Sequence, residues 1–310
     1  MKRTALLLAI LLPVAASFTS CKKDGVYNPK QKISRIYYAY SSPDPDFNSE
    51  KELKEIWDWD GKKLSAITYY FKNDEVEGTE KFTYDGKRIS RTDYVAADGR
   101  NVAYVLYSYD GRKLDKMEYY WWGELAESYQ YSYDGKKLSK MEVTYYDHYN
   151  HFDDLTSQMA KQRHSLRSRM FRNTVPEAVC TSMDWIAETY MTTDMPFRQK
   201  GGYYTWTVNL TWDGKNVSKV EYYDPNNELI SIQYSYDKNI NPFCGFYSMD
   251  ILDEEEQNLN TSKNNVVSET WNDGYRADYS YQYDGSKFPT SKTVKWAGDE
   301  DSEIWYYEYK

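Results

Sequence analysis

The chain is 310 residues long, carries a formal net charge of −9 and contains 34 tyrosines and 10 tryptophans. The acidic charge excludes nucleic acid as a natural partner, because a phosphate backbone is also negative. Hydropathy is low, but aromatic side chains bury large areas and supply a core where Leu and Ile are few. Since a chain of this length can bury roughly 75% of its unfolded surface, we expect a folded domain.

Residues 1–20 have the layout of a secretory signal peptide. Two basic residues precede an apolar run over residues 5–16, which is too short for a stop-transfer helix. The run ends in the sequence FTSC, which resembles a bacterial lipobox with Phe18 in the position where Leu is usual. We predict that Cys21 is lipidated and becomes the new N-terminus. The alternative is an ordinary cleaved signal followed by an incidental cysteine.

The predicted anchor also indicates where in the cell the protein lies. Two or more acyl chains on one cysteine hold a soluble domain stably on a membrane. The sequence after Cys21 is Lys22-Lys23-Asp24, without the Asp directly after the cysteine that often marks inner-membrane retention. Such a charged start resembles the surface-export signals of gut Gram-negative lipoproteins. We therefore expect an outer-membrane lipoprotein of the cell envelope, facing the surface or the periplasm, with residues 21–32 as a polar tether.

One β-hairpin unit recurs through the rest of the chain, and its clearest copy is Tyr131–Tyr146. Asp134-Gly135 is among the strongest signals for a two-residue type I′ turn, which needs φ > 0 at both positions. Apolar and polar residues alternate on both sides of the turn, which is the period of a strand. The repeated turns are Asp60-Gly61, Asp85-Gly86, Asp110-Gly111, Asp134-Gly135, Asp213-Gly214 and Asp284-Gly285. A further copy keeps the register but has Lys238 in place of the glycine.

An aliphatic residue follows each turn and lies three residues before the next inward position. These residues are Leu64, Ile89, Leu114, Leu138 and Val217. A strict pleat would put each of them on the wrong face of the sheet, so the spacing predicts a bulge or a strong twist just past the turn.

Each period of about 24 residues also contains a second, more variable turn and so contributes two strands. The sequence predicts an antiparallel meander of about 14–16 strands, more than an open twisted sheet carries without curling. We predict one all-β domain over residues 33–310 in which the sheet is barrel-like or strongly curved. One face of every strand carries charged residues, whereas a membrane-spanning barrel faces lipid with apolar ones, so we expect a soluble barrel.

Two insertions interrupt the meander. The longer one, at about residues 147–200, is expected to form short helices, one of them with a basic face, that cap one end of the sheet or cover an open edge. The shorter one covers residues 239–264 and includes the acidic run Asp253–Glu256. The spacing of this run does not fit a calcium-binding loop, which favours a solvated loop.

The repeats carry a family resemblance. The YDGKKL units resemble the YD-type hairpin repeats of bacterial surface proteins. More specifically, the segments YDKNINPFCGF, SKNNVVSETW and YSYQYDGSKFPTSKTV resemble a family of uncharacterised gut-bacterial lipoproteins described as having a porin-like fold. This resemblance implies a β-barrel fold and an envelope location, and it brings no activity, because the family has none established. The basic insertion after Tyr146 departs from the family pattern.

The sequence contains no recognisable catalytic apparatus. His148 and His151 suggest a metal site with the neighbouring aspartates, but this segment lies at a junction between a strand and the insertion, and we predict no metal and no cofactor. Cys180 and Cys244 lack neighbouring bases and are predicted to form either a disulfide or two buried thiols. Carboxylates are abundant, but no pair stands out from a solvated surface.

Consecutive aromatic residues give the one indication of binding. The run Tyr119-Tyr120-Trp121-Trp122 must place side chains on both faces of a strand, because successive side chains point in opposite directions. Some are therefore exposed and suited to a ligand such as a sugar ring, unless they cover a sheet edge or pack under the insertion.

Together these observations predict a lipid-anchored, non-enzymatic binding or structural module whose partners, besides the membrane, are a glycan or another surface protein. Two alternatives stay open. One is a carbohydrate-active enzyme with a cleft between the sheet and the insertion at residues 147–200. The other is a purely architectural role.

Overall fold

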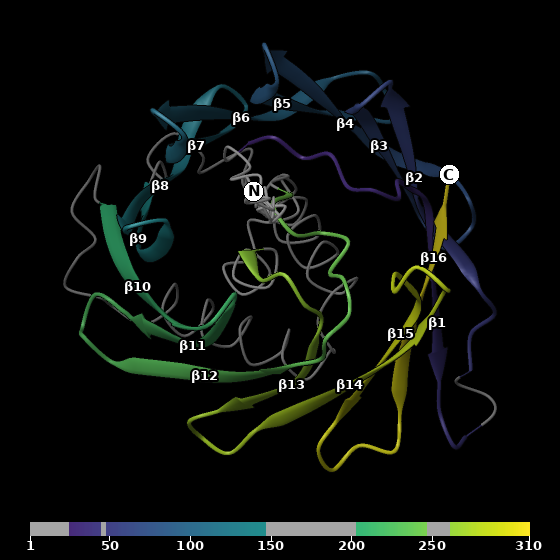
Figure 1. Ribbon diagram of the computed structural model, residues 1–310. Coiled ribbons are helices and arrows are strands. Elements are labelled where there is room, and N and C mark those ends of the chain that lie inside the picture. The colour runs from purple at the N-terminus through teal and green to yellow at the C-terminus, as the bar shows by residue number, and fades with distance from the viewer. Residues whose placement is uncertain (1–24, 45–47, 147–202, 247–260) are drawn as a thin grey trace, which may run out of the picture.

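The computed structural model describes residues 25–44, 48–146, 203–246 and 261–310, and within them the chain is all β. Sixteen antiparallel strands form one closed barrel (Figure 1). The strands are β1 (Ile33–Ser41), β2 (Glu52–Asp60), β3 (Lys63–Tyr70), β4 (Val76–Asp85), β5 (Arg88–Ala96), β6 (Asn101–Asp110), β7 (Lys113–Trp121), β8 (Glu124–Asp134), β9 (Lys137–Tyr146), β10 (Tyr203–Asp213), β11 (Asn216–Tyr223), β12 (Leu229–Tyr236), β13 (Val266–Trp271), β14 (Arg276–Tyr283), β15 (Pro289–Trp296) and β16 (Ser302–Tyr309).

The strand order confirms the predicted meander and decides between a closed and an open sheet. Every strand pairs with its neighbours in sequence, and β1 pairs with β16 from Ile33–Tyr309 to Ser41–Ser302, which closes the ring. Among the described residues, no helix is long and apolar enough to cross a membrane. The predicted helical insertion at residues 147–200 lies outside the described part of the chain.

All six Asp-Gly turns lie at the same end of the barrel, because they alternate along the meander with the more variable turns. We call this end the Asp-Gly end and the other the opposite end. The turn type differs from the prediction. Asp60 pairs with Lys63, so the two loop residues are Gly61 and Lys62, and only Gly61 has positive φ, at 54°. This is the pattern of a type II′ turn, with glycine in the first central position, rather than of a type I′ turn centred on Asp-Gly.

The predicted bulge past each turn is present. Trp59 pairs with Leu64 and Asp58 pairs with Ala66, so one residue of β3 is unpaired. Similar register shifts follow the turns before Ile89, Leu114, Leu138 and Val217. The extra residue lets the aliphatic side chain return to the inner face, where all five are buried.

A repeated contact, which we call the latch, joins several pairs of neighbouring hairpins at the Asp-Gly end. The aromatic side chain before the turn donates a hydrogen bond to the carbonyl of the bulged aliphatic residue in the preceding hairpin. Examples are Tyr84 Oη to Leu64 O at 2.8 Å and Trp212 Nε1 to Leu138 O at 2.6 Å. A cation from the preceding turn lies over the same ring, as Lys63 does over Tyr84 at 4.9 Å. The YDGKKL pattern therefore encodes contacts between hairpins as well as turns.

The inner face of the barrel carries the apolar and aromatic core, which includes Ile67, Met117, Tyr129, Met141 and Ile232, all almost fully buried. Two irregular segments at the Asp-Gly end pack onto this face (Figure 1). Residues 25–32, which the sequence assigned to a tether, form one of them, and residues 237–246 the other. Tyr27 joins the two, because its ring lies 4.8 Å from that of Phe246 and its hydroxyl donates to Pro242 O at 2.8 Å.

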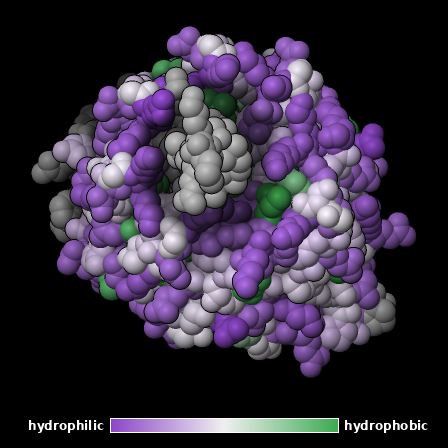
Figure 2. Space-filling model, viewed as in Figure 1, coloured by the Kyte–Doolittle hydropathy of each residue, from purple (hydrophilic) through white to green (hydrophobic). Residues whose placement is uncertain are grey.

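The outer face is polar along the middle of the strands, and the end of the barrel that faces the viewer in Figure 2 is predominantly hydrophilic. Five strands repeat an ion pair between a cation and the carboxylate two residues later, both on the outer face. The pairs are Arg91–Asp93, Lys116–Glu118, Lys140–Glu142, Lys219–Glu221 and Arg276–Asp278, with N–O distances of 2.5–2.9 Å. The outer face is thus charged and polar, whereas the inner face is mainly apolar and aromatic.

Candidate functional site

The structure separates the four aromatic residues that the sequence singled out. Tyr119 is buried on the inner face, and Trp121 packs against the core beside it, with ring centroids 6.3 Å apart. Tyr120 lies on the outer face of β7, and Trp122 lies in the turn between β7 and β8 with 37% of its surface exposed. The expectation that adjacent aromatics face opposite ways is confirmed, and only Tyr120 and Trp122 remain available to a ligand.

Tyr120 belongs to a row of tyrosines that crosses the outer face near the opposite end of the barrel. Its ring stacks on Tyr104 of β6, with centroids 4.6 Å apart and planes 10° from parallel. Farther along the row, Tyr146 of β9 lies 6.4 Å from Tyr203 of β10, and Tyr203 is 71% exposed. We call these four residues the outer tyrosine row. Burial and then the charge of Glu118 raise the pKa of Tyr120, so its hydroxyl is protonated and can donate a hydrogen bond.

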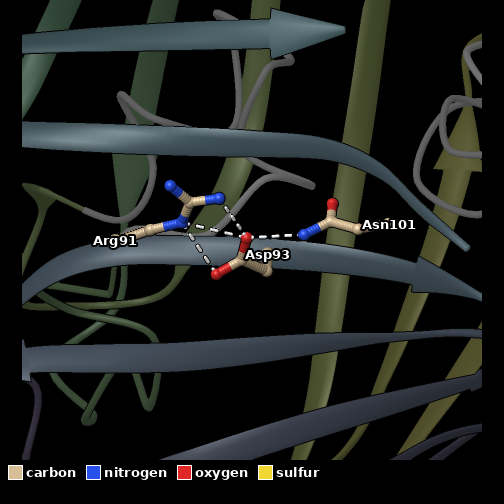
Figure 3. Close-up of polar contacts among 3 residues, drawn as sticks. All are labelled: Arg91, Asp93 and Asn101. Atoms are coloured by element: carbon tan, nitrogen blue, oxygen red, sulfur yellow. Dashed lines mark hydrogen bonds and ion pairs between the residues drawn. The ribbon is translucent and has the colours of Figure 1, made fainter. Parts of the chain in front are cut away.

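A polar cluster continues the row on β5 and β6 (Figure 3). Arg91 donates to both carboxylate oxygens of Asp93, with its Nε 2.9 Å from each, and Asn101 Nδ2 donates to Asp93 Oδ1 at 2.7 Å. The Arg91 guanidinium also lies 4.1 Å from the centroid of Tyr104. Burial acts to raise the pKa of Asp93, but the hydrogen bonds from Arg91 and Asn101 outweigh it and lower that pKa. The cluster therefore presents fixed planar polar groups beside an aromatic surface.

Trp122 forms a second aromatic position at the rim of the same region. It has positive φ, at 51°, and its backbone N–H donates to Val102 O at 2.9 Å. The Arg100 guanidinium lies 5.4 Å from the Trp122 ring centroid and is itself held by Asp98 at 2.6 Å. The ring is thus fixed at the edge of the barrel and partly open to solvent.

The inner face of β15 and β16 contains a different feature, a buried carboxyl group. Glu303 is 5% exposed, and burial raises its pKa to about 7, while the nearby Lys292 partly offsets the effect. The side chain of Trp296, on the same face, is also buried, and its indole N–H has no hydrogen-bond partner in the structure. These residues are covered by the barrel and are not open to a large ligand.

Other predicted site residues fall outside the described part of the chain. Cys21, Cys180 and all three histidines lie there, so lipidation and the disulfide remain predictions; Cys244 is half-buried in residues 237–246. Among the described residues, no group of His, Cys, Asp and Glu is arranged to hold a metal ion.

Sequence reasoning missed Tyr104, Arg91, Asp93 and Asn101. The available signal was the cation-x-carboxylate pattern that recurs after the turns, as in RTD and KME.

Comparison with known proteins shows that the fold of this chain distantly resembles two solved structures. No protein-family model matches the chain, and no curated protein matches it. A crystal structure of a porin-like protein from Bacteroides uniformis ATCC 8492 is 9% identical with a TM-score of 0.49, and the match covers 90% of this chain and 98% of that one. A porin-like protein from Bacteroides vulgatus ATCC 8482 is 12% identical with a TM-score of 0.32, over 90% and 99% of the two chains.

Proposed function

We propose that this chain is a lipid-anchored, water-facing barrel of the bacterial envelope that binds carbohydrate on the outer tyrosine row and does not form a membrane pore. The observation that carries the proposal is the outer row itself, with partly exposed rings beside the Arg91–Asp93–Asn101 cluster on a charged outer face.

The polarity of the barrel argues against a transmembrane position. A barrel that crosses a membrane needs an apolar outer band, since a charge at mid-membrane costs about 2–4 kcal/mol for Arg or Lys. Here ion pairs such as Lys116–Glu118 and Lys140–Glu142 lie on the outer face in mid-strand. The inner face carries a large cluster of buried apolar and aromatic side chains, with buried carboxylates such as Glu303 among them, whereas an aqueous channel has a predominantly polar lining.

The outer row has the chemistry that sugar recognition uses. A sugar ring offers an apolar face of C–H groups, which packs on an aromatic ring, and hydroxyl groups, which need fixed planar donors and acceptors. Tyr104 is held between Arg91 and Tyr120, so the stack is ordered before any ligand binds. Preorganisation of this kind lowers the entropic cost of binding. Trp122 gives a further surface for a longer chain of sugars at the rim.

A glycan screen of the chain from residue 21, with Cys21→Ser to prevent acylation, tests the proposal. We expect a glycan that raises the thermal midpoint, and a loss of affinity of about tenfold or more in Tyr120→Ala, which corresponds to about 1.4 kcal/mol. Trp122→Ala should weaken binding of longer glycans. Tyr37→Ala is the matched control, because Tyr37 is also half-buried but lies across the barrel on β1.

Three outcomes would count against this function. One is saturating glycan coverage without a hit, after which capture of a surface protein would be the next test. Another is a hit that Tyr120→Ala and Tyr37→Ala affect equally. The third is a protein that needs detergent to stay in solution and conducts ions in planar bilayers, because a water-facing barrel should do neither.

A further inference from the structure

Exposed cations gather at the Asp-Gly end of the barrel. Four of the turns there read Asp-Gly followed by two basic residues, at positions 60–63, 85–88, 110–113 and 134–137. The first cation of each pair is exposed at the tip of the turn. With the other exposed cations of this end that lie outside the latch, it forms what we call the basic ring, composed of Lys30, Lys62, Lys87, Arg112, Lys136, Lys215, Lys238, Lys263, Lys287 and Lys310.

The two cations of each pair have different structural roles. The second one lies over an aromatic ring of the latch, as Arg88 does over Tyr109 at 4.6 Å and Lys113 over Tyr133 at 4.7 Å. The latch therefore explains the position of the second cation. The first cation of a pair, such as Lys62 or Lys87, takes no part in the latch. Each turn carries one aspartate for its two basic residues, so each of these four turns is net positive.

The opposite end has the reverse charge. Exposed carboxylates dominate the turns of that end that the structure describes, and they include Asp74, Glu75, Glu124, Glu228, Asp273, Asp299 and Glu300. Within the described residues, the barrel is thus positive at the Asp-Gly end and negative at the opposite end, although the whole chain is acidic at −9. A charge separation along the axis gives the molecule a preferred orientation beside a charged surface.

The chain path brings the N-terminus to the positive end. Gly25 O accepts a hydrogen bond from Ile89 N at 3.0 Å, just past the turn at 85–88, and Lys32 O accepts one from Lys310 N at 2.9 Å. Gly25 and Tyr27 are buried there. Cys21 is four residues before Gly25, and four residues span at most about 14 Å. An acyl chain on Cys21 would therefore enter the membrane close to the basic ring.

We infer that the basic ring is a docking surface for anionic lipid headgroups and holds the barrel with its Asp-Gly end on the membrane. The orientation of the barrel in this inference rests on the lipid anchor of the proposed function. The basic ring itself does not depend on acylation. Clusters of Lys and Arg near an anionic bilayer are attracted to it, and stable attachment commonly combines acyl chains with such a patch. The outer tyrosine row, near the opposite end, is then presented away from the membrane.

Vesicle binding by the chain from residue 21 with Cys21→Ser tests this, since the acyl anchor is removed and all strands are retained. We expect cosedimentation with phosphatidylcholine vesicles that contain phosphatidylglycerol and not with pure phosphatidylcholine, and release by salt at about 0.5 M, where the Debye length is only a few ångströms. The combined variant Lys62→Glu, Lys87→Glu and Arg112→Glu should bind at least about tenfold more weakly.

The control has the same change in charge at exposed cations outside the ring: Lys72→Glu, Lys81→Glu and Lys295→Glu combined. It should keep affinity within about twofold of the parent chain, since its charges lie outside the docking surface. Equal losses in the two variants would show a general charge effect and overturn the docking surface, as would no binding to the anionic vesicles at low salt. Glycan binding measured on the same preparations separates a failure here from a failure of the carbohydrate proposal.

Discussion

Which side chains contact one another in this barrel depends on the register between neighbouring strands. Alternation along β7 predicts that Tyr119 and Tyr120 face opposite sides of the sheet, and the structure places Tyr119 inside and Tyr120 outside. The partner of Tyr120 is not predictable in the same way, because Tyr104 is paired with it only through the register of β6 on β7. Asn101 of β6 likewise meets Asp93 of β5 only through the register of these two strands. A repeat pattern shows which face of the sheet each residue occupies. It does not show which residues of neighbouring hairpins lie beside one another.

At the residue scale, the buried carboxyl group of Glu303 leads us to predict a pH dependence of stability. Its pKa in the fold is about 7 against an ordinary value of 4.5, so the folded state holds a proton that the unfolded state releases. Its contribution to stability is present below pH 4.5 and is lost as pH rises through about 7, by up to about 3 kcal/mol. We expect Glu303→Gln to raise the free energy of unfolding at pH 8 and to leave it nearly unchanged at pH 4.

Denaturant unfolding at the two pH values measures this difference. Glu308→Gln, on a side chain of the outer face that is 44% exposed, serves as the control and should change stability little at either pH. A Glu303→Gln variant that is no more stable than the parent chain at pH 8 would mean that the carboxylate is compensated in the fold.

At the scale of the hairpin, the sequence predicted the two strands and the bulge past the turn, but it misplaced the turn itself. Asp-Gly was read as the loop, whereas the aspartate ends a strand and pairs with the second cation, as Asp110 does with Lys113. The glycine is the residue that needs positive φ. The latch was not foreseen, since it joins residues far apart in sequence, 20 positions for Tyr109 and Ile89 and 74 for Trp212 and Leu138. The chemistry of a single hairpin does not reveal contacts between hairpins.

Two glycines of the repeat allow a matched test of this turn geometry. Gly86 has φ of +60°, whereas in the turn at 284–287 the positive φ belongs to Lys287 and not to Gly285. Apart from the glycine itself and its two chain neighbours, no atom lies within 4 Å of the Cβ that alanine would add at either position, so the two sites differ in backbone conformation and not in crowding. We expect Gly86→Ala to cost about 1–2 kcal/mol and Gly285→Ala to be nearly neutral, as measured by thermal or denaturant unfolding. Equal costs would contradict the assigned turn geometry.

At the scale of the whole molecule, the number of strands and the curvature of the sheet could be predicted, but closure could not. About 14–16 strands are compatible with both an open and a closed sheet, and closure depends on complementarity between the first and last strands. Here β1 and β16 pair along their whole length. The packing of residues 25–32 into the barrel was also missed, because these residues are polar overall and the partners of Tyr27 are distant in sequence, such as Phe246.

Tyr27 therefore tests whether the segments at the Asp-Gly end are part of the fold or only lie on it. Its ring contacts Trp57, Trp59 and Phe246, and it is 2% exposed. Loss of a buried aromatic side chain of this size costs about 3–5 kcal/mol. We expect Tyr27→Ala to lower the free energy of unfolding by about that amount and to make the N-terminal residues sensitive to limited proteolysis. Tyr203→Ala, at a 71% exposed side chain, should change stability by no more than about 0.5 kcal/mol. If Tyr27→Ala exposes the N-terminal segment to protease without any loss of stability, the segment is a removable cover, and the barrel depends on its strands alone.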